Sequence, residues 1–130
     1  MEELYYYRWW AWRKHIRQIP GGFVLTEFLK PVRHATDYNA ISCAFGHHVA
    51  EGRWLHDPEY LDAYARFWLQ SGPGGGIQPK FHQFSGWAAA ALYERYLVDG
   101  RREFLTSLLK PLQLDYESWE QERRLPSGLF

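Results

Sequence analysis

The sequence predicts an all-α protein built from antiparallel αα-hairpins, and three observations support this fold class. First, apolar residues recur at spacings of three and four between Asn39 and Leu55, as on one face of a helix. Second, another such run extends from Pro58 to Leu69 after a very short connector, and helices joined in this way lie antiparallel. Asp57 can cap the second helix, and Pro58 suits its first position.

A repeated segment is the third observation. The run RWLHDPEYL, which begins at Arg53, resembles RYLVDGRREFL, which begins at Arg95, about 42 residues further on. An offset of this size is the length of a helical-hairpin repeat. The sequence therefore contains more than one copy of the same two-helix unit.

The remaining elements follow from local composition. A helix is expected over 4–17, where aromatic residues form two stripes, and a Pro-Gly-Gly run ends it. Residues 23–29 are β-branched and aromatic and could form a short extended piece. Helices are then expected over 86–99 and 101–123, and Pro111 should kink the last one or restart it just before that residue.

The connectors between these helices alternate in length. Segments 18–40 and 71–84 are long, as is the segment that begins at Leu125, whereas 56–57 and 99–100 are short. In a layer of helices that alternate up and down, this pattern gathers the long connectors at one end. Long connectors on a rigid helical layer are where functional sites are commonly built.

The predicted helix 86–99 poses a problem of coverage. Four successive alanines make its first turns apolar nearly all round, so it belongs inside a larger structure. Repeated hairpins bury their faces only against neighbours, and neither end of this chain has a polar outer helix. We expect residues 1–130 to form one partial helical domain, an incomplete portion of a toroid that needs the remainder of the ring or copies of itself.

Composition narrows the classes of function. Fifteen basic and fifteen acidic residues give no net charge, which argues against a nucleic-acid partner or an anionic membrane surface. No run of eighteen apolar residues exists, so no membrane span is expected. The single cysteine, Cys43, forms no intrachain disulfide and favours a reducing, cytoplasmic location. Seven Trp, nine Tyr and eight Phe suit either a deep core or a cleft in which sugars or bases stack.

Four stretches of the chain resemble a known family. They are YYYRWWAWRKHI, FVLTEFL, YNAISCAFGHHVAEGRWLHDPEYLDAYARFWL and FSGWAAAALYERYLVDG, and the most specific part is GHH followed by EGRWL. Together they resemble the six-hairpin (α/α)6-barrel glycosidases, in the mannosylglycerate-hydrolase-like and glucosidase-like branch related to glycoside hydrolase family 63. The resemblance covers nearly the whole chain.

This resemblance implies both a fold and an activity. Such enzymes have twelve helices in an inner and an outer ring, and they hydrolyse α-linked glucosides or mannosides with inversion. Their general acid would lie just beyond the PSGLF ending of this sequence, and their general base nearer the family's C-terminus. We therefore expect this chain to supply part of the sugar-binding cleft, with a carbohydrate as its ligand and with no catalytic residue of its own.

Candidate contacts to a sugar come first from the N-terminal helix. Arg8, Trp9 and Trp10 together offer aromatic faces for stacking and a cation for hydroxyl or carboxylate groups. The alternative for these residues is packing between helices, with Arg8 in a structural ion pair. His47 and Glu51 share one helix face, and we expect them to belong to a polar network that lines the cleft.

Further candidates lie in or beside the long connectors, namely Glu27, Asn39 and Trp87, although Asn39 could instead cap a helix. No metal site is expected, because a zinc-protease pattern needs two His four residues apart, whereas His47 and His48 are adjacent. The sequence implies no other cofactor.

Two alternatives remain from other classes of function. One is a non-enzymatic helical-repeat module that binds a protein or peptide, which the 42-residue repeat and the apolar faces favour. The other is a nucleic-acid surface made by basic residues among the aromatic residues of 4–17, and the zero net charge argues against it.

Overall fold

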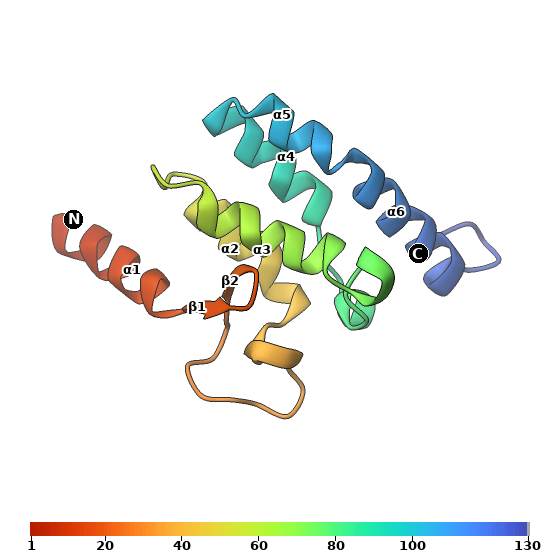
Figure 1. The fold of residues 1–130 in the computed structure, drawn as a ribbon, viewed down its shortest axis with the longest axis horizontal. Coiled ribbons are helices and arrows are strands. Elements are labelled where there is room, and N and C mark those ends of the chain that lie inside the picture. Colours follow the sequence, from red (N-terminus) through yellow and green to blue (C-terminus); the bar gives the residue numbers. More distant parts are fainter. Residues whose placement is uncertain (130) are drawn as a thin grey trace.

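The computed structural model describes residues 1–129, and they form a mostly helical domain with one small β-hairpin (Figure 1). Short 3-10 turns at Asp37–Asn39, Ser42–Ala44, Pro73–Gly75 and Phe81–Gln83 lie within the connectors. The helices and strands, in chain order, are α1 Glu2–Lys14, β1 Ile16–Ile19, β2 Gly22–Leu25, α2 Phe45–Gly52, α3 Glu59–Gln70, α4 Ala88–Asp99, α5 Arg102–Ser107 and α6 Leu109–Arg123.

The two predicted αα-hairpins are confirmed. α2 and α3 run in opposite directions, as do α4 and the α5–α6 pair (Figure 1). Asp57 Oδ1 accepts the Glu59 N–H at 2.9 Å, so the predicted cap begins α3. Gly100 ends α4 in the left-handed conformation, with φ of +65°, which glycine adopts without steric cost.

The connectors also lie as predicted. The short α2–α3 and α4–α5 connectors are at the upper left of Figure 1, whereas the segments 26–44, 71–87 and 124–129 are at the bottom and right. α2 packs along α4, and α3 packs against α6, so the α2–α3 hairpin lies beside the hairpin that α4 forms with α5 and α6. The long connectors therefore share one side of the helical layer.

The all-α prediction is wrong for residues 16–25, which form an antiparallel β-hairpin. Ile16 pairs with Leu25, and Ile19 pairs with Gly22. The helix expected over 4–17 ends at Lys14, because the chain enters β1 before Pro20. β2 lies against α3, and Gly22 approaches it so closely that an added Cβ would be 2.7 Å from the Ala63 Cβ. Burial of β2 on α3 outweighs the local preference of the preceding residues for helix.

The expected break in the last helix is present, and it falls just before Pro111. α5 ends at Ser107, and α6 begins at Leu109. Leu108, between them, is fully buried. Pro111 then occupies the first turn of α6, where its missing N–H costs no helical hydrogen bond. The residue four positions before Pro111 is Ser107, and a proline can neither donate a helical hydrogen bond to that carbonyl nor fit beside it, so the break falls where Pro111 predicts it.

The core lies where α2, α3 and α4 meet the β-hairpin. Its largest fully buried side chain is Trp68, which stacks on Phe81 with ring centroids 5.2 Å apart. The other fully buried large side chains belong mostly to α2, α3 and β2: Tyr64, Phe45, Leu25, Leu61, Leu69, Leu108, Val24 and Val49. Such an aromatic core accounts for much of the unusual composition.

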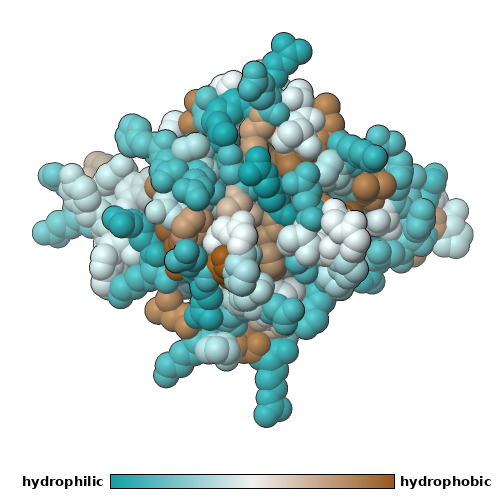
Figure 2. Space-filling model, viewed as in Figure 1, coloured by the Kyte–Doolittle hydropathy of each residue, from teal (hydrophilic) through white to brown (hydrophobic). Residues whose placement is uncertain are grey.

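One face of α4 stays open, so this inner helix is not enclosed by residues 1–129. Ala91 and Leu92 are buried, whereas Tyr93 and Leu97 are 54% and 63% exposed. Figure 2 shows apolar residues interspersed with hydrophilic ones on the face viewed in Figure 1. No helix among residues 1–129 has the length and apolarity required to cross a membrane.

Candidate functional site

Four of the predicted sugar-contacting residues meet in a cleft between α1 and α2, which we call the α1–α2 cleft. Its volume is about 790 Å³, within the range of small-molecule sites. The predicted residues that line it are Arg8, Trp9, His47 and Glu51, and Tyr5, Ala50 and Trp54 complete the wall. The cleft thus combines aromatic faces with a cation and a carboxylate.

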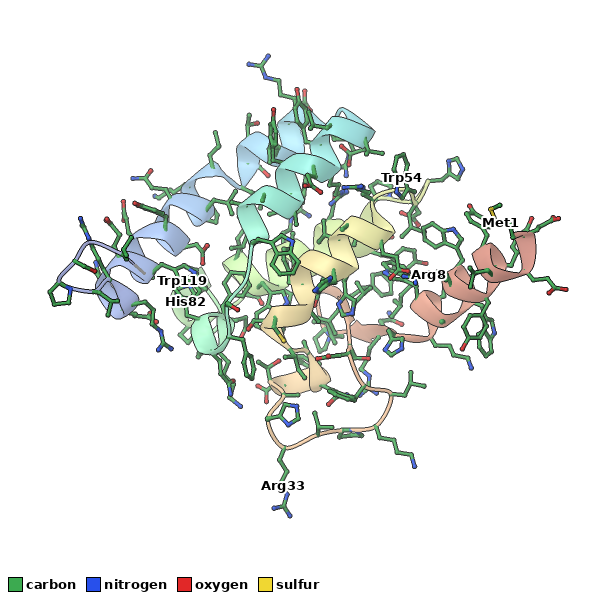
Figure 3. The ribbon with its side chains drawn as sticks, turned by 180° about the vertical axis from the view of Figure 1, so that it is seen from behind. Met1, Arg8, Arg33, Trp54, His82 and Trp119 are labelled. Carbon is green, nitrogen blue, oxygen red and sulfur yellow. The ribbon has the colours of Figure 1, made fainter. Side chains whose placement is uncertain are left out.

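Arg8 and Glu51 join the two walls of the cleft. The Arg8 Nε donates to Glu51 Oε1 at 2.9 Å, and the Arg8 Nη2 donates to the same oxygen. The Arg8 side chain is 65% exposed and that of Glu51 is 34% exposed, so water screens the pair and its contribution to stability is small. Figure 3 shows Arg8 between the two helices. Both groups remain accessible to a ligand that offers hydroxyls.

Trp54 is a cleft residue that the sequence analysis missed. It follows α2 in the short connector and is 61% exposed (Figure 3). The Arg53 guanidinium lies 5.5 Å from the centroid of the Trp54 ring. The signals for Trp54 in the sequence were membership of the repeated segment that begins at Arg53 and of the EGRWL motif that carries the family resemblance. Such an exposed indole can stack on the apolar face of a sugar ring.

Trp12 fixes the position of α1 relative to the cleft. It is 4% exposed, and its Nε1 donates to the His48 carbonyl at 3.3 Å. The ring of Trp9 meets that of Trp12 edge to face, with centroids 6.0 Å apart. The buried indole therefore supports the half-buried one that faces the cleft.

Trp87 lies beside the α1–α2 cleft, where its ring contacts the ring of His47. Their rings meet at 84° with centroids 4.7 Å apart. Gly46 permits this arrangement, since an added Cβ there would be 2.5 Å from the Trp87 ring. Trp87 thus positions His47 rather than lining the α1–α2 cleft.

Glu27 lies in a smaller neighbouring cavity of about 260 Å³, which Arg8 and Glu51 also line. The Arg8–Glu51 pair thus separates two cavities. His15 and His48 are further lining residues of the smaller one. Glu27 is close to the predicted group but not inside the main cleft.

The structure places Asn39 and Trp10 outside both cavities. Asn39 is 5% exposed, and its amide donates to the carbonyls of Phe28 and Lys30, at 2.6 and 3.1 Å, and accepts the Val32 N–H at 2.9 Å. Asn39 therefore holds the connector 26–44 together. Trp10 is 54% exposed, and the Lys14 ammonium lies 3.3 Å from its ring centroid.

His48 is neutral at physiological pH. Burial, followed by the charges of His15 and His47, lowers the pKa of His48 to about 4. Its Nδ1 is 3.2 Å from the Tyr64 hydroxyl, whose own pKa burial raises. A neutral Tyr64 can donate to the unprotonated Nδ1. Among residues 1–129, no three His, Cys, Asp or Glu side chains form a group that could hold a metal ion.

Comparisons with known proteins define the class. Residues 37–130 match the model of the mannosylglycerate hydrolase MGH1-like glycoside hydrolase domain, so the chain is a fragment of a domain of this kind. It belongs to the MGH1-like glycoside hydrolase family, as its sequence motifs predicted.

A solved structure titled "Sialidase" is 46% identical to this chain and superposes on 99% of it with a TM-score of 0.94. The match covers only 12% of that structure's chain, so the chain spans a small part of the protein it resembles. No curated protein matches the chain.

Proposed function

We propose that this chain forms part of an (α/α)6 toroid in an inverting glycoside hydrolase that acts on α-linked glucosides or mannosides. In this role it supplies part of the sugar-binding cleft and none of the catalytic carboxylates. Two findings carry the proposal. The chain belongs to a glycoside hydrolase family, and one cleft is lined by Arg8, Trp9, His47 and Glu51.

The chemistry of the α1–α2 cleft suits binding. Trp9 and Trp54 present flat apolar faces for the C–H side of a sugar ring, and Arg8 and Glu51 present a donor and an acceptor for its hydroxyls. Inverting hydrolysis requires two carboxyl groups separated by roughly 6.5–9.5 Å, with water between them. Glu51 is the one carboxylate among the described residues that line the cleft, so the cleft lacks the second carboxyl group that inversion requires.

Two exposed apolar faces support the incomplete toroid. α1 carries Tyr6 and Trp10, which are 62% and 54% exposed, and α4 carries Tyr93 and Leu97. Helices of this kind are normally covered on such faces. The "Sialidase" match covers 12% of that chain, so most of that longer polypeptide lies outside the matched region and is available to cover such faces.

Sugar binding tests the cleft directly. Titration of the chain with maltotriose and with an α-linked mannotriose, followed by isothermal calorimetry, should give measurable binding that Trp9→Ala weakens by about tenfold or more. Trp10→Ala is the matched control, because Trp10 lies on the same helix outside the cleft. Equal losses from the two substitutions would contradict the assignment of the cleft.

A second candidate function is a non-enzymatic helical-repeat module, which the exposed aromatic residues of α1 favour. It predicts a protein partner, or association with copies of itself, without any affinity for sugars. Sedimentation across a concentration series, together with the sugar titration, discriminates the two. Turnover of an α-glucoside by the 130-residue chain would instead refute the part of the first proposal that assigns it no catalytic carboxylate.

A further inference from the structure

A second cleft, which we call the connector cleft, lies among the long connectors, away from the α1–α2 cleft. Its volume is about 600 Å³. The turn of the β-hairpin, the loop around Tyr38, the end of α3 and the segment that follows it together form its walls. The lining residues on which the inference rests are Pro20, Asp37, Tyr38, Phe67, Gln78 and Lys80.

An unfavourable backbone conformation presents Tyr38 to this cleft. Tyr38 has a φ of +63°, and Asn39 after it has a φ of +65°. Asparagine tolerates the left-handed region, but for a tyrosine it is strained. The strain persists only because neighbouring groups fix the turn, and Thr36 does so with its N–H and its hydroxyl, which both donate to the Ala40 carbonyl.

The turn places the Tyr38 ring at the cleft rather than in the core. The ring is edge-on to that of Phe67, with centroids 6.2 Å apart, and Tyr38 remains 42% exposed. An exposed aromatic ring gains little from burial, so the packing of Tyr38 alone does not explain why strain is retained here. Strained backbone of this kind is concentrated at ligand-binding sites, so it points to a ligand that covers the ring.

The polar groups around the ring define the ligand class. Lys80 Nζ donates to the Ala35 carbonyl at 3.2 Å, and Gln78 Nε2 donates to Ser71 Oγ at 2.9 Å. Both side chains keep further hydrogen-bonding capacity, and the Asp37 carboxylate adds acceptors. One carboxylate and one ammonium balance in charge, which favours a neutral ligand. A neutral molecule with apolar faces and many hydroxyls is a carbohydrate.

We propose that the connector cleft is a second carbohydrate-binding site, in which a neutral sugar stacks on Tyr38 and hydrogen-bonds to Asp37 and Lys80. The assignment goes beyond the proposed role of the α1–α2 cleft, with which it shares no residue. In a glycoside hydrolase, such a site would hold a length of glycan away from the α1–α2 cleft.

Tyr38→Gly tests the site sharply, because glycine removes the ring and also relieves the strained φ. Thermal unfolding should therefore be nearly unchanged, while the affinity of the connector cleft for maltotriose, or for the α-linked mannotriose if that sugar binds there instead, falls at least tenfold. Asp37→Asn should weaken the same binding severalfold without changing the fold. Chemical shifts of the Tyr38 backbone amide should move on titration of the unsubstituted chain.

The two proposed sites can be tested separately. Trp9→Ala should leave the signal at Tyr38 unchanged, and Tyr38→Gly should leave binding in the α1–α2 cleft unchanged. Unaltered sugar binding by Tyr38→Gly, or a signal at Tyr38 that does not respond to either sugar at millimolar concentration, would overturn the second site while leaving the first untouched.

Discussion

Gly52 lies directly against the indole of Trp12, and the contact joins α1 to α2. A Cβ added to Gly52 would be 2.5 Å from Trp12 Cζ2, a distance that no side chain can occupy without movement. Trp12 is the residue by which α1 enters the core, and its neighbour Trp9 faces the α1–α2 cleft. The geometry of that cleft therefore depends on residue 52 being glycine, which has no Cβ to displace Trp12.

Gly52→Ala should displace Trp12 and loosen α1. We expect the free energy of unfolding to fall by about 1–3 kcal/mol, as for other overpacked cores. Tryptophan fluorescence during denaturant unfolding measures the change. Gly86→Ala is the control, because an added Cβ there meets no atom within 4 Å. Similar stability for both variants would show that the Trp12 ring moves aside freely.

Asp62→Asn should destabilise the end of the domain that carries the short connectors. Asp62 is 8% exposed and accepts from Arg95 Nη2 at 2.5 Å and from Arg101 Nη1 at 2.8 Å. Arg95 keeps its ion pair with Asp99 at 3.0 Å, but it loses the Asp62 charge, and a buried hydrogen bond to a charged group contributes about 1.5–3 kcal/mol. Denaturant unfolding gives the measurement.

The control for Asp62 is the exposed pair of Arg124 and Glu120, 3.1 Å apart. Glu120→Gln should change stability by less than about 1 kcal/mol, because water screens such a pair. An equally small effect of Asp62→Asn would mean that Arg95 finds other partners.

Acidification should destabilise the fold through His48. Burial holds its pKa near 4 in the folded protein, whereas an unfolded histidine titrates near 6.5. The unfolded chain therefore binds this proton first, and stability falls as pH drops from about 6.5 to about 4. The loss in the free energy of unfolding should approach about 3 kcal/mol, and stability above pH 7 should not depend on this group.

His48→Gln should flatten this part of the pH profile in urea unfolding experiments. His56→Gln is its control, because it removes a histidine that is exposed rather than buried. If the slope between about pH 4 and 6.5 survived in the His48 variant, another buried group would be its source.

Asn39→Ala should destabilise the connector 26–44. The substitution removes three side-chain hydrogen bonds to the backbone and places alanine at a φ of +65°. We expect a loss of about 2–4 kcal/mol, or local disorder of the connector that hydrogen exchange detects. Arg33→Ala, in the same connector with its side chain extending away from the body (Figure 3), should change little. Intact stability with weakened sugar binding would restore the role predicted for Asn39 from the sequence.

Local signals in the sequence determined the helical hairpins. Asp57 caps α3, and Gly100 ends α4, through contacts with residues only a few positions away. Such interactions are readable because the sequence neighbours are also the structural neighbours. Family membership was equally readable from the motifs around GHH and EGRWL. A cytoplasmic location, the inverting mechanism and the sugar remain predictions.

Contacts between distant residues were decided only by the tertiary structure. Arg8 and Glu51 are 43 positions apart, and their pairing follows from the way Trp12 docks α1 on α2. The strand β1 forms because β2 is buried on α3, and Asn39 turns inward because three backbone groups need a partner. Burial and hydrogen-bond satisfaction act on whichever groups the fold brings together, so the helices could be predicted one at a time, whereas the clefts between them required the coordinates.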